Sequence, residues 1–198
     1  MTQQATDLFY YEGNQLQVIG ITGTGLYTPE KFGIKTRSAS TGCWRGYIMR
    51  YEIKDNQLFM EGFWVKTLEG IEPPMINEII PSQITKEYNP GGLRGIGFNY
   101  YYQDVYLKLP FTGSLLLGNR PIEEEYVHMG YPSPTYFQTV LKFDFKNGDL
   151  LKIEDISDRV EEARKLGDPK GYSPESDSPE DIKKWVEKRF SLDSNFEI

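Results

Sequence analysis

One stretch of the sequence, residues 47–65, restricts the fold more than any other. In residues 47–54, every second side chain is large and apolar or aromatic, and the positions between them include the charged residues Arg50, Glu52 and Lys54. Since side chains of a strand point to opposite faces in turn, this alternation predicts a strand with one face in the core and one in water. Asp55 and Asn56 interrupt the pattern, and both residue types tolerate the positive φ of a tight turn. With the aromatic-rich residues 58–65 after it, the stretch predicts a β-hairpin. The side chains expected to face the core are Tyr47, Met49, Tyr51 and Ile53.

The same pattern recurs further along the chain. Residues 143–150 match residues 51–58 in chemical class at most positions. Asn147 and Gly148 stand at the turn, and Asn-Gly between apolar runs is the strongest short signal for a hairpin. A second strong hairpin is therefore predicted here.

Two weaker copies of the pattern begin at Phe9 and Leu109, the second with Thr112-Gly113 as its expected turn. The order of weak and strong copies suggests two similar halves, residues 8–66 and 106–156. An internal duplication would explain this order. So would chance, because every hairpin needs apolar alternation around a turn.

Residues 68–90 are the least periodic part, and residues 67–105 are interpreted as the connection between the halves. Residues 1–7 are polar and are expected to fray. After the β domain, residues 8–156, the apolar period changes to that of helices, and residues 157–198 form a helical extension. Ser178 and Pro179 mark the clearest helix start.

The predicted fold is mainly antiparallel β, with about eight to ten strands. The strands form a barrel or strongly curved sheet built from repeated hairpins, followed by one or two C-terminal α-helices. A two-sheet sandwich is the closest alternative. We expect the helices to pack on the β domain rather than on a partner.

The net charge of the chain limits the classes of molecule that it is expected to bind. The 198-residue chain has 29 acidic and 22 basic residues, a net charge of −7. Because phosphate groups repel an acidic surface, we expect neither nucleic acid nor an anionic membrane as partner. The N-terminal residues do not resemble a signal peptide, and no apolar run approaches the roughly 20 residues of a membrane span. These features predict a soluble, cytoplasmic protein.

The composition offers little to a catalytic site. Cys43 is the only cysteine and His128 the only histidine, so a Cys–His dyad and a Ser–His–Asp arrangement would both depend on that one histidine. The sequence has no Gly-x-Ser-x-Gly motif for a nucleophilic serine. One cysteine and one histidine cannot build a standard zinc site, and no metal or other cofactor is expected. We predict that Cys43 is a buried, inert thiol. The composition therefore favours a non-catalytic protein.

Trp44 and Arg45 are the first candidates for a binding site. Arginine can hold a carboxylate while tryptophan stacks on a ligand. The alternative is that Trp44 fills the end of the core and Arg45 is a surface charge. Arg94 is a further candidate, in a Gly-rich loop that lacks the ending of a phosphate-binding P-loop.

Tyrosines suggest a second surface. Residues 98–109 are predicted to form one strand, with Tyr100, Tyr102 and Tyr106 on a half-wet face. Neighbouring exposed tyrosines suit a binding surface, although tyrosine is also ordinary in strands. His128 completes the candidate set.

Three functions remain open at this stage. The first is a non-catalytic protein-binding module, by analogy an inhibitor or immunity protein that covers a basic partner. The second is a barrel that binds a small molecule at its mouth through Trp44, Arg45 and Arg94. The third is an enzyme that uses Cys43 or His128. A deep pocket at the barrel end would favour a ligand, and a filled barrel with a flat aromatic patch would favour a protein partner.

Overall fold

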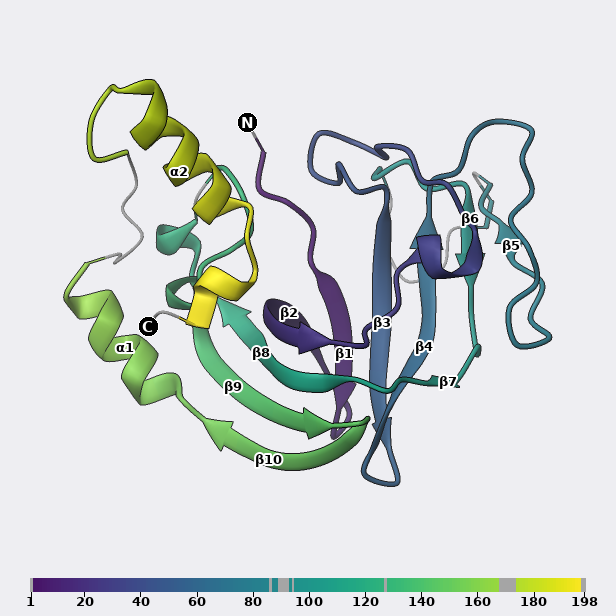
Figure 1. The fold of residues 1–198 in the computed structure, drawn as a ribbon, viewed down its shortest axis with the longest axis horizontal. Coiled ribbons are helices and arrows are strands. Elements are labelled where there is room, and N and C mark those ends of the chain that lie inside the picture. The colour runs from purple at the N-terminus through teal and green to yellow at the C-terminus, as the bar shows by residue number, and fades with distance from the viewer. Residues whose placement is uncertain are drawn as a thin grey trace.

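The chain folds around one strongly curved sheet (Figure 1). The computed structural model describes residues 2–85, 87–88, 93, 95–126, 128–167 and 174–196. Ten strands form the sheet in the order β10-β9-β8-β2-β1-β3-β4-β6-β5, with β7 paired to β4. The strands are β1 (Asp7–Tyr11), β2 (Asn14–Thr24), β3 (Tyr47–Lys54), β4 (Gln57–Val65), β5 (Ser82–Gln83), β6 (Tyr100–Tyr102), β7 (Leu107–Lys108), β8 (Thr112–Pro121), β9 (Phe137–Lys146) and β10 (Asp149–Asp155).

A pairing between β10 and β4, with Asp149 opposite Gln57, closes seven of the strands into a ring. Two helices follow the ring, α1 (Ser157–Lys165) and α2 (Pro179–Arg189). The predicted mainly β fold with a strongly curved sheet and C-terminal helices is confirmed. The short 3-10 helices are η1 (Pro29–Phe32), η3 (Glu123–Glu125), η4 (Pro134–Tyr136) and η5 (Asp193–Phe196).

Three of the four predicted hairpins form. Asp55 and Asn56 have φ of 50° and 63° at the β3–β4 turn, and Asn147 has φ of 51° at the β9–β10 turn. Each of these residue types accepts the left-handed backbone that a two-residue turn requires. The first hairpin turns at Glu12 and Gly13.

The fourth predicted hairpin is wrong. Thr112 and Gly113 are the first two residues of strand β8, which pairs with β2, while β7 pairs with β4. A Cβ on Gly113 would overlap the backbone of Thr22 in β2, so this glycine permits close strand approach rather than a turn. The two halves also pair differently, because β1 and β3 are parallel whereas β8 and β9 are antiparallel.

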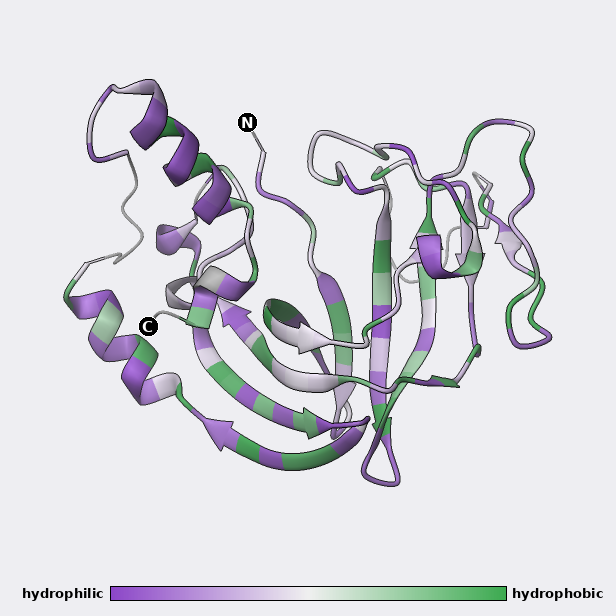
Figure 2. Cartoon of the chain, viewed as in Figure 1, coloured by the Kyte–Doolittle hydropathy of each residue, from purple (hydrophilic) through white to green (hydrophobic). Residues whose placement is uncertain are grey.

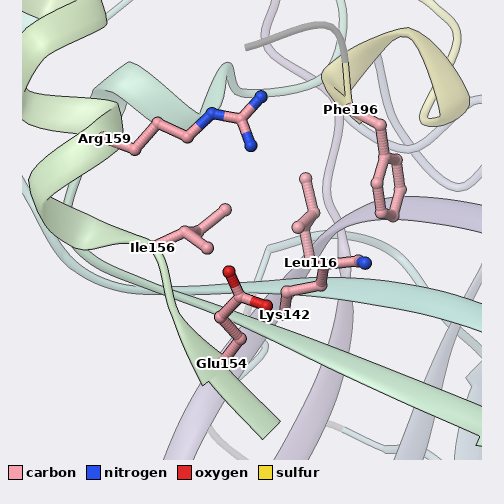
Figure 3. Close-up of a pocket in the computed structure, with 6 residues that line it drawn as sticks. All are labelled: Leu116, Lys142, Glu154, Ile156, Arg159 and Phe196. Carbon is pink, nitrogen blue, oxygen red and sulfur yellow. The ribbon is translucent and has the colours of Figure 1, made fainter. Parts of the chain in front are cut away.

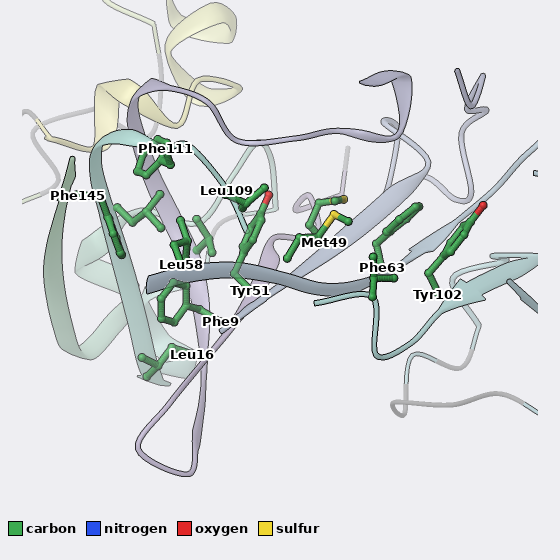
Figure 4. Close-up of a cluster of buried hydrophobic side chains, with 14 of the residues drawn as sticks. Phe9, Leu16, Met49, Tyr51, Leu58, Phe63, Tyr102, Leu109, Phe111 and Phe145 are labelled. Atoms are coloured by element: carbon green, nitrogen blue, oxygen red, sulfur yellow. The ribbon is translucent and has the colours of Figure 1, made fainter. Parts of the chain in front are cut away.

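The interior of the ring is filled by side chains (Figure 4). Met49 and Tyr51 of β3 point inward, as the alternation predicts, together with Phe143 and Phe145 of β9. Phe9 meets Phe143 edge to face at 5.5 Å. Edge-to-face contacts of this kind add to the stabilisation from apolar burial. The ring is therefore a packed core along most of its length.

A long loop crosses one end of the ring between β2 and β3. Ile34 is buried in the ring's core, and the Phe32 ring stacks on Phe63 with centroids 6.3 Å apart.

The C-terminal extension packs on the β domain. Ser178 caps α2 by accepting a hydrogen bond from the Asp181 amide at 3.1 Å, as its sequence predicts. After α2, the buried Asn195 donates to the carbonyl oxygens of Ile19 and Pro132. Leu166, the residue that follows α1, is exposed.

Glycine substitutions test how the chain enters β3. Gly46 and Gly33 have nearly the same φ, 76° and 75°. A Cβ at Gly46 would overlap the carbonyl oxygen of Arg37, whereas a Cβ at Gly33 meets nothing within 4 Å. Gly33→Ala should cost about 1–2 kcal/mol, the ordinary penalty of the left-handed region. Gly46→Ala should cost about 1–3 kcal/mol more, because of overpacking. Urea unfolding of both variants measures the difference, and equal losses would contradict the expected clash.

Candidate functional site

A largely buried ion pair lies where β1 and β3 begin. Arg45 donates from Nη2 to Asp7 Oδ1 at 2.6 Å and from Nη1 to Asp7 Oδ2 at 3.1 Å. Asp7 Oδ1 also accepts from the backbone N–H of Met49 at 2.7 Å. The side chains of Asp7 and Arg45 are only 4% and 18% exposed. Arg45 is therefore not the surface charge that the alternative interpretation expected.

Trp44 does not fill the core. Its side chain is 48% exposed. Its ring stacks on Phe190, just after α2, with centroids 5.1 Å apart and planes 8° from parallel. Trp44 therefore holds the C-terminal segment against the entrance to β3.

A cavity of about 330 Å³ lies beside this ion pair, and we call it the mouth cavity. Tyr47 and Tyr51 of β3 contribute one wall, and Tyr131 another. The C-terminal segment closes a further side, where the Ile21 amide donates to the Leu192 carbonyl at 3.3 Å. The lining residues are Asp7, Ile21, Leu26, Thr28, Arg45, Tyr47, Tyr51, Tyr131, Phe190 and Leu192.

The polar groups of the mouth cavity are neutral phenols around a balanced ion pair. Burial raises the pKa of Tyr47 to about 12, although Arg45 opposes the shift. Burial likewise raises the pKa of Tyr51 and of Tyr131. Burial alone would lower the pKa of Arg45, but the Asp7 carboxylate raises it above its usual value. The guanidinium therefore stays charged, and Asp7 cancels that charge.

Cys43 and His128 lie in different surroundings. The Cys43 side chain is buried beside Leu8, Ile48 and Trp64, as predicted. Burial raises the pKa of its thiol, although Arg45 acts in the opposite direction. His128 is exposed, with its ring edge-on to Tyr126 at 4.8 Å. A raised thiol pKa works against nucleophilic chemistry.

The predicted tyrosine surface is wrong at Tyr102. Residues 98–109 form two short strands, β6 and β7, instead of one. Tyr102 is fully buried and stacks on Phe63 at 4.4 Å, and Tyr100 is half-buried against the same core. Their face is covered because the chain after β4 folds over it, and Tyr102 donates to the Pro74 carbonyl at 2.5 Å. Of the predicted set, Tyr106 is exposed, below the Lys54 ammonium.

Arg94 lies outside the described residues, so the structure does not place this predicted contact.

Several lining residues were missed from the sequence. Asp7 could have been found from the sequence, because period-two alternation places it on the same strand face as the core residue Phe9. A carboxylate on a core face needs a partner. Tyr131, Phe190 and Leu192 give no comparable signal, since they reach the cavity from distant segments.

Two other cavities differ in character. One, on the outer face of β1 and β3, contains an ion pair between Arg50 Nε and Glu61 Oε2 at 2.8 Å. The other, about 160 Å³, lies between the sheet and α1, with Lys142, Glu154 and Arg159 around Leu116 and Ile156 (Figure 3). The first is dominated by carboxylates and the second is small, so the mouth cavity is the better candidate.

Within the described ranges, no group of three or more His, Cys, Asp or Glu side chains is placed to hold a metal ion. No helix in the described part of the chain combines the length and apolar character needed to cross a membrane. Comparison with protein-family models, with curated proteins and with solved structures finds no match to this chain.

The Asp7–Arg45 pair should contribute strongly to stability. Asp7→Ala leaves a largely buried guanidinium without its counter-ion, and it removes the acceptor of the Met49 amide. We expect a loss of about 3 kcal/mol or more in the free energy of unfolding. Asp144→Ala is the control, because its pair with Lys142 is more exposed and should contribute about 1 kcal/mol or less. Equal losses for the two variants, measured by urea unfolding, would contradict this role.

Alkaline pH should lower the free energy of unfolding, because the Tyr47 phenol ionises more readily in the unfolded chain. Its pKa rises from 10.0 to about 12 on folding. The unfolded chain therefore releases this proton first, and the stability from the neutral phenol, fully present below pH 10, is lost as pH rises toward 12. Tyr47→Phe should lose less stability than the wild type across this window, because the other tyrosines contribute equally to both proteins. Identical pH profiles of unfolding would refute the assignment.

Proposed function

We propose that this protein binds a small molecule in the mouth cavity. The observation that carries the proposal is the convergence of three tyrosines, Tyr47, Tyr51 and Tyr131, on a cavity beside the Asp7–Arg45 pair. A concave site with apolar walls and a few convergent polar groups is typical of small-molecule binding. Its volume of about 330 Å³ falls at the lower end of the usual range, about 300–1,000 Å³.

The lining indicates the chemical class of the ligand. Ile21, Leu26 and Leu192 offer apolar contact, and Phe190 offers an aromatic wall. Phenol hydroxyls of raised pKa remain protonated and can donate to a carbonyl or ether oxygen. The ligand should therefore be compact and mostly apolar, with one or two hydrogen-bond acceptors.

The charge balance favours a neutral ligand. The Arg45 guanidinium already makes two bonds to Asp7, so an anion would have to compete with a bidentate carboxylate. A neutral ligand does not compete for these two bonds and would leave the Asp7–Arg45 pair intact.

The other two predicted functions have weaker support at this site. The tyrosine face that motivated a protein-binding module is partly buried, at Tyr102 above all. An enzyme using Cys43 would need a reactive thiol, and burial, which raises the pKa of Cys43, argues against one. His128 is exposed and does not line the mouth cavity. Ligand binding uses Arg45, which the sequence already singled out, and Trp44 contributes by holding Phe190 in the cavity wall.

Filling the cavity provides the test. Leu26→Trp adds a large side chain to the mouth cavity, and Leu151→Trp adds the same side chain at an exposed site on β10. Prodan, a neutral naphthalene ketone whose fluorescence reports apolar surroundings, should bind the wild type and Leu151→Trp alike. Its affinity for Leu26→Trp should fall at least about tenfold, which corresponds to roughly 1.4 kcal/mol.

A second measurement identifies the natural ligand. Mass spectrometry of protein from the cells that naturally make it, before and after denaturing extraction, should show a neutral compound that Leu26→Trp no longer retains. Urea unfolding checks that both variants fold. Unchanged probe binding by Leu26→Trp, together with no retained compound in the wild type, would refute the proposal.

A further inference from the structure

Apolar side chains are exposed on one segment after β4. We call residues 68–80 the flap. It carries Met75, 61% exposed, and Ile80, 77% exposed, with Leu68 and Ile71 also exposed. Figure 2 shows apolar and hydrophilic stretches side by side in the loop between β4 and β5. Single exposed apolar residues are ordinary, but a gathering of them on one segment marks an interaction site.

The flap presents two of these side chains together. Ile76 and Ile79 exchange backbone hydrogen bonds of 3.0 Å and 2.9 Å across a two-residue turn. Ile76 is buried in the ring's core and Ile79 packs against it. Because side chains alternate along each arm of such a turn, Met75 and Ile80 lie next to each other on the opposite, outward side.

Specific bonds hold the flap in place. The Asn77 side chain donates to the Val105 carbonyl at 2.6 Å, and Tyr102 holds the Pro74 carbonyl from the other side. Pro73 is buried beneath the segment. The outward side chains are therefore displayed on an anchored support, which lowers the ordering cost of binding a partner.

Charge indicates the kind of partner. Glu69, Glu72 and Glu78 are exposed in the flap, and residues 68–80 contain no Lys, Arg or His. A second copy of this chain would bring like charges together at the same surface, and an anionic membrane would repel it. A protein surface with lysine or arginine around an apolar groove complements both features of the flap.

We propose that the flap docks a basic protein partner, with Met75 and Ile80 entering an apolar groove rimmed by lysine or arginine. Apolar anchors near the centre of an interface contribute most of its affinity, and surrounding charges select the partner. The basic partner expected from the net charge is thus assigned to a surface other than the tyrosines. No flap residue lines the mouth cavity, so this site is independent of the small-molecule site.

Photo-crosslinking tests the proposal in the cells that naturally make the protein. A benzophenone amino acid replaces Met75 in one variant and Leu151, exposed on β10, in the control. Crosslinked peptides are then identified by mass spectrometry. Position 75 should join to a lysine- or arginine-rich segment of one other protein, and position 151 should not.

Two further variants separate the apolar and charged contributions to binding. Adding Ile80→Ser, which removes apolar surface without adding a charge, should reduce the crosslink at position 75 at least tenfold. Replacing Glu72 and Glu78 by Gln should reduce it and make the remainder less sensitive to salt. A crosslink to a second copy, to lipid or to an acidic protein segment would overturn the proposal, as would no crosslink above the control.

Discussion

The carboxylate of Asp7 organises the end of the ring on which the candidate site is built. It accepts two bonds from Arg45 and one from the Met49 amide, so it links the start of β1 to the turn before β3 and to β3 itself. These two strands are parallel neighbours and join the first two hairpins of the chain. A buried carboxylate is costly unless it is fully bonded. The same bonds that satisfy it therefore also set where Arg45 and Tyr47 stand.

The packing of the interior decides where a ligand could enter. Aromatic and aliphatic side chains fill the ring along most of its length, which leaves space at the end rather than along the axis. The wall at that end is completed by Phe190 and Leu192, held by Trp44 and by β2. Residues nearly 150 positions apart in sequence thus share one cavity, and the C-terminal segment belongs to the site as much as the strands do.

The flap connects the packing of the core with the outer surface. Its inward residues cover the tyrosine face of β6, which is why Tyr102 is unavailable to a partner. Its outward residues, Met75 and Ile80, are exposed and form an apolar surface with carboxylates around it. The mouth cavity is electrically balanced and the flap is acidic, so the two surfaces suit different chemistries, a neutral small molecule and a basic protein.

The sequence by itself determined the local structure. Period-two alternation identified the core faces of β3 and β9, turn residues of positive φ located the tight hairpins, and Ser178 marked the start of α2. These features depend on residues close together in the chain, whose preferences local backbone geometry decides.

Only the tertiary structure decided the rest. Alternation assigns Tyr102 and Tyr100 to one face but does not say that the flap covers it. Local turn propensity at Thr112-Gly113 did not prevail over the long pairing of β8 with β2. Nor could spacing show that Arg45 would turn inward to Asp7 while Trp44 met Phe190, because those partners lie far away in sequence. Which distant segments meet depends on packing of the whole core, and that is a property of the fold rather than of any stretch within it.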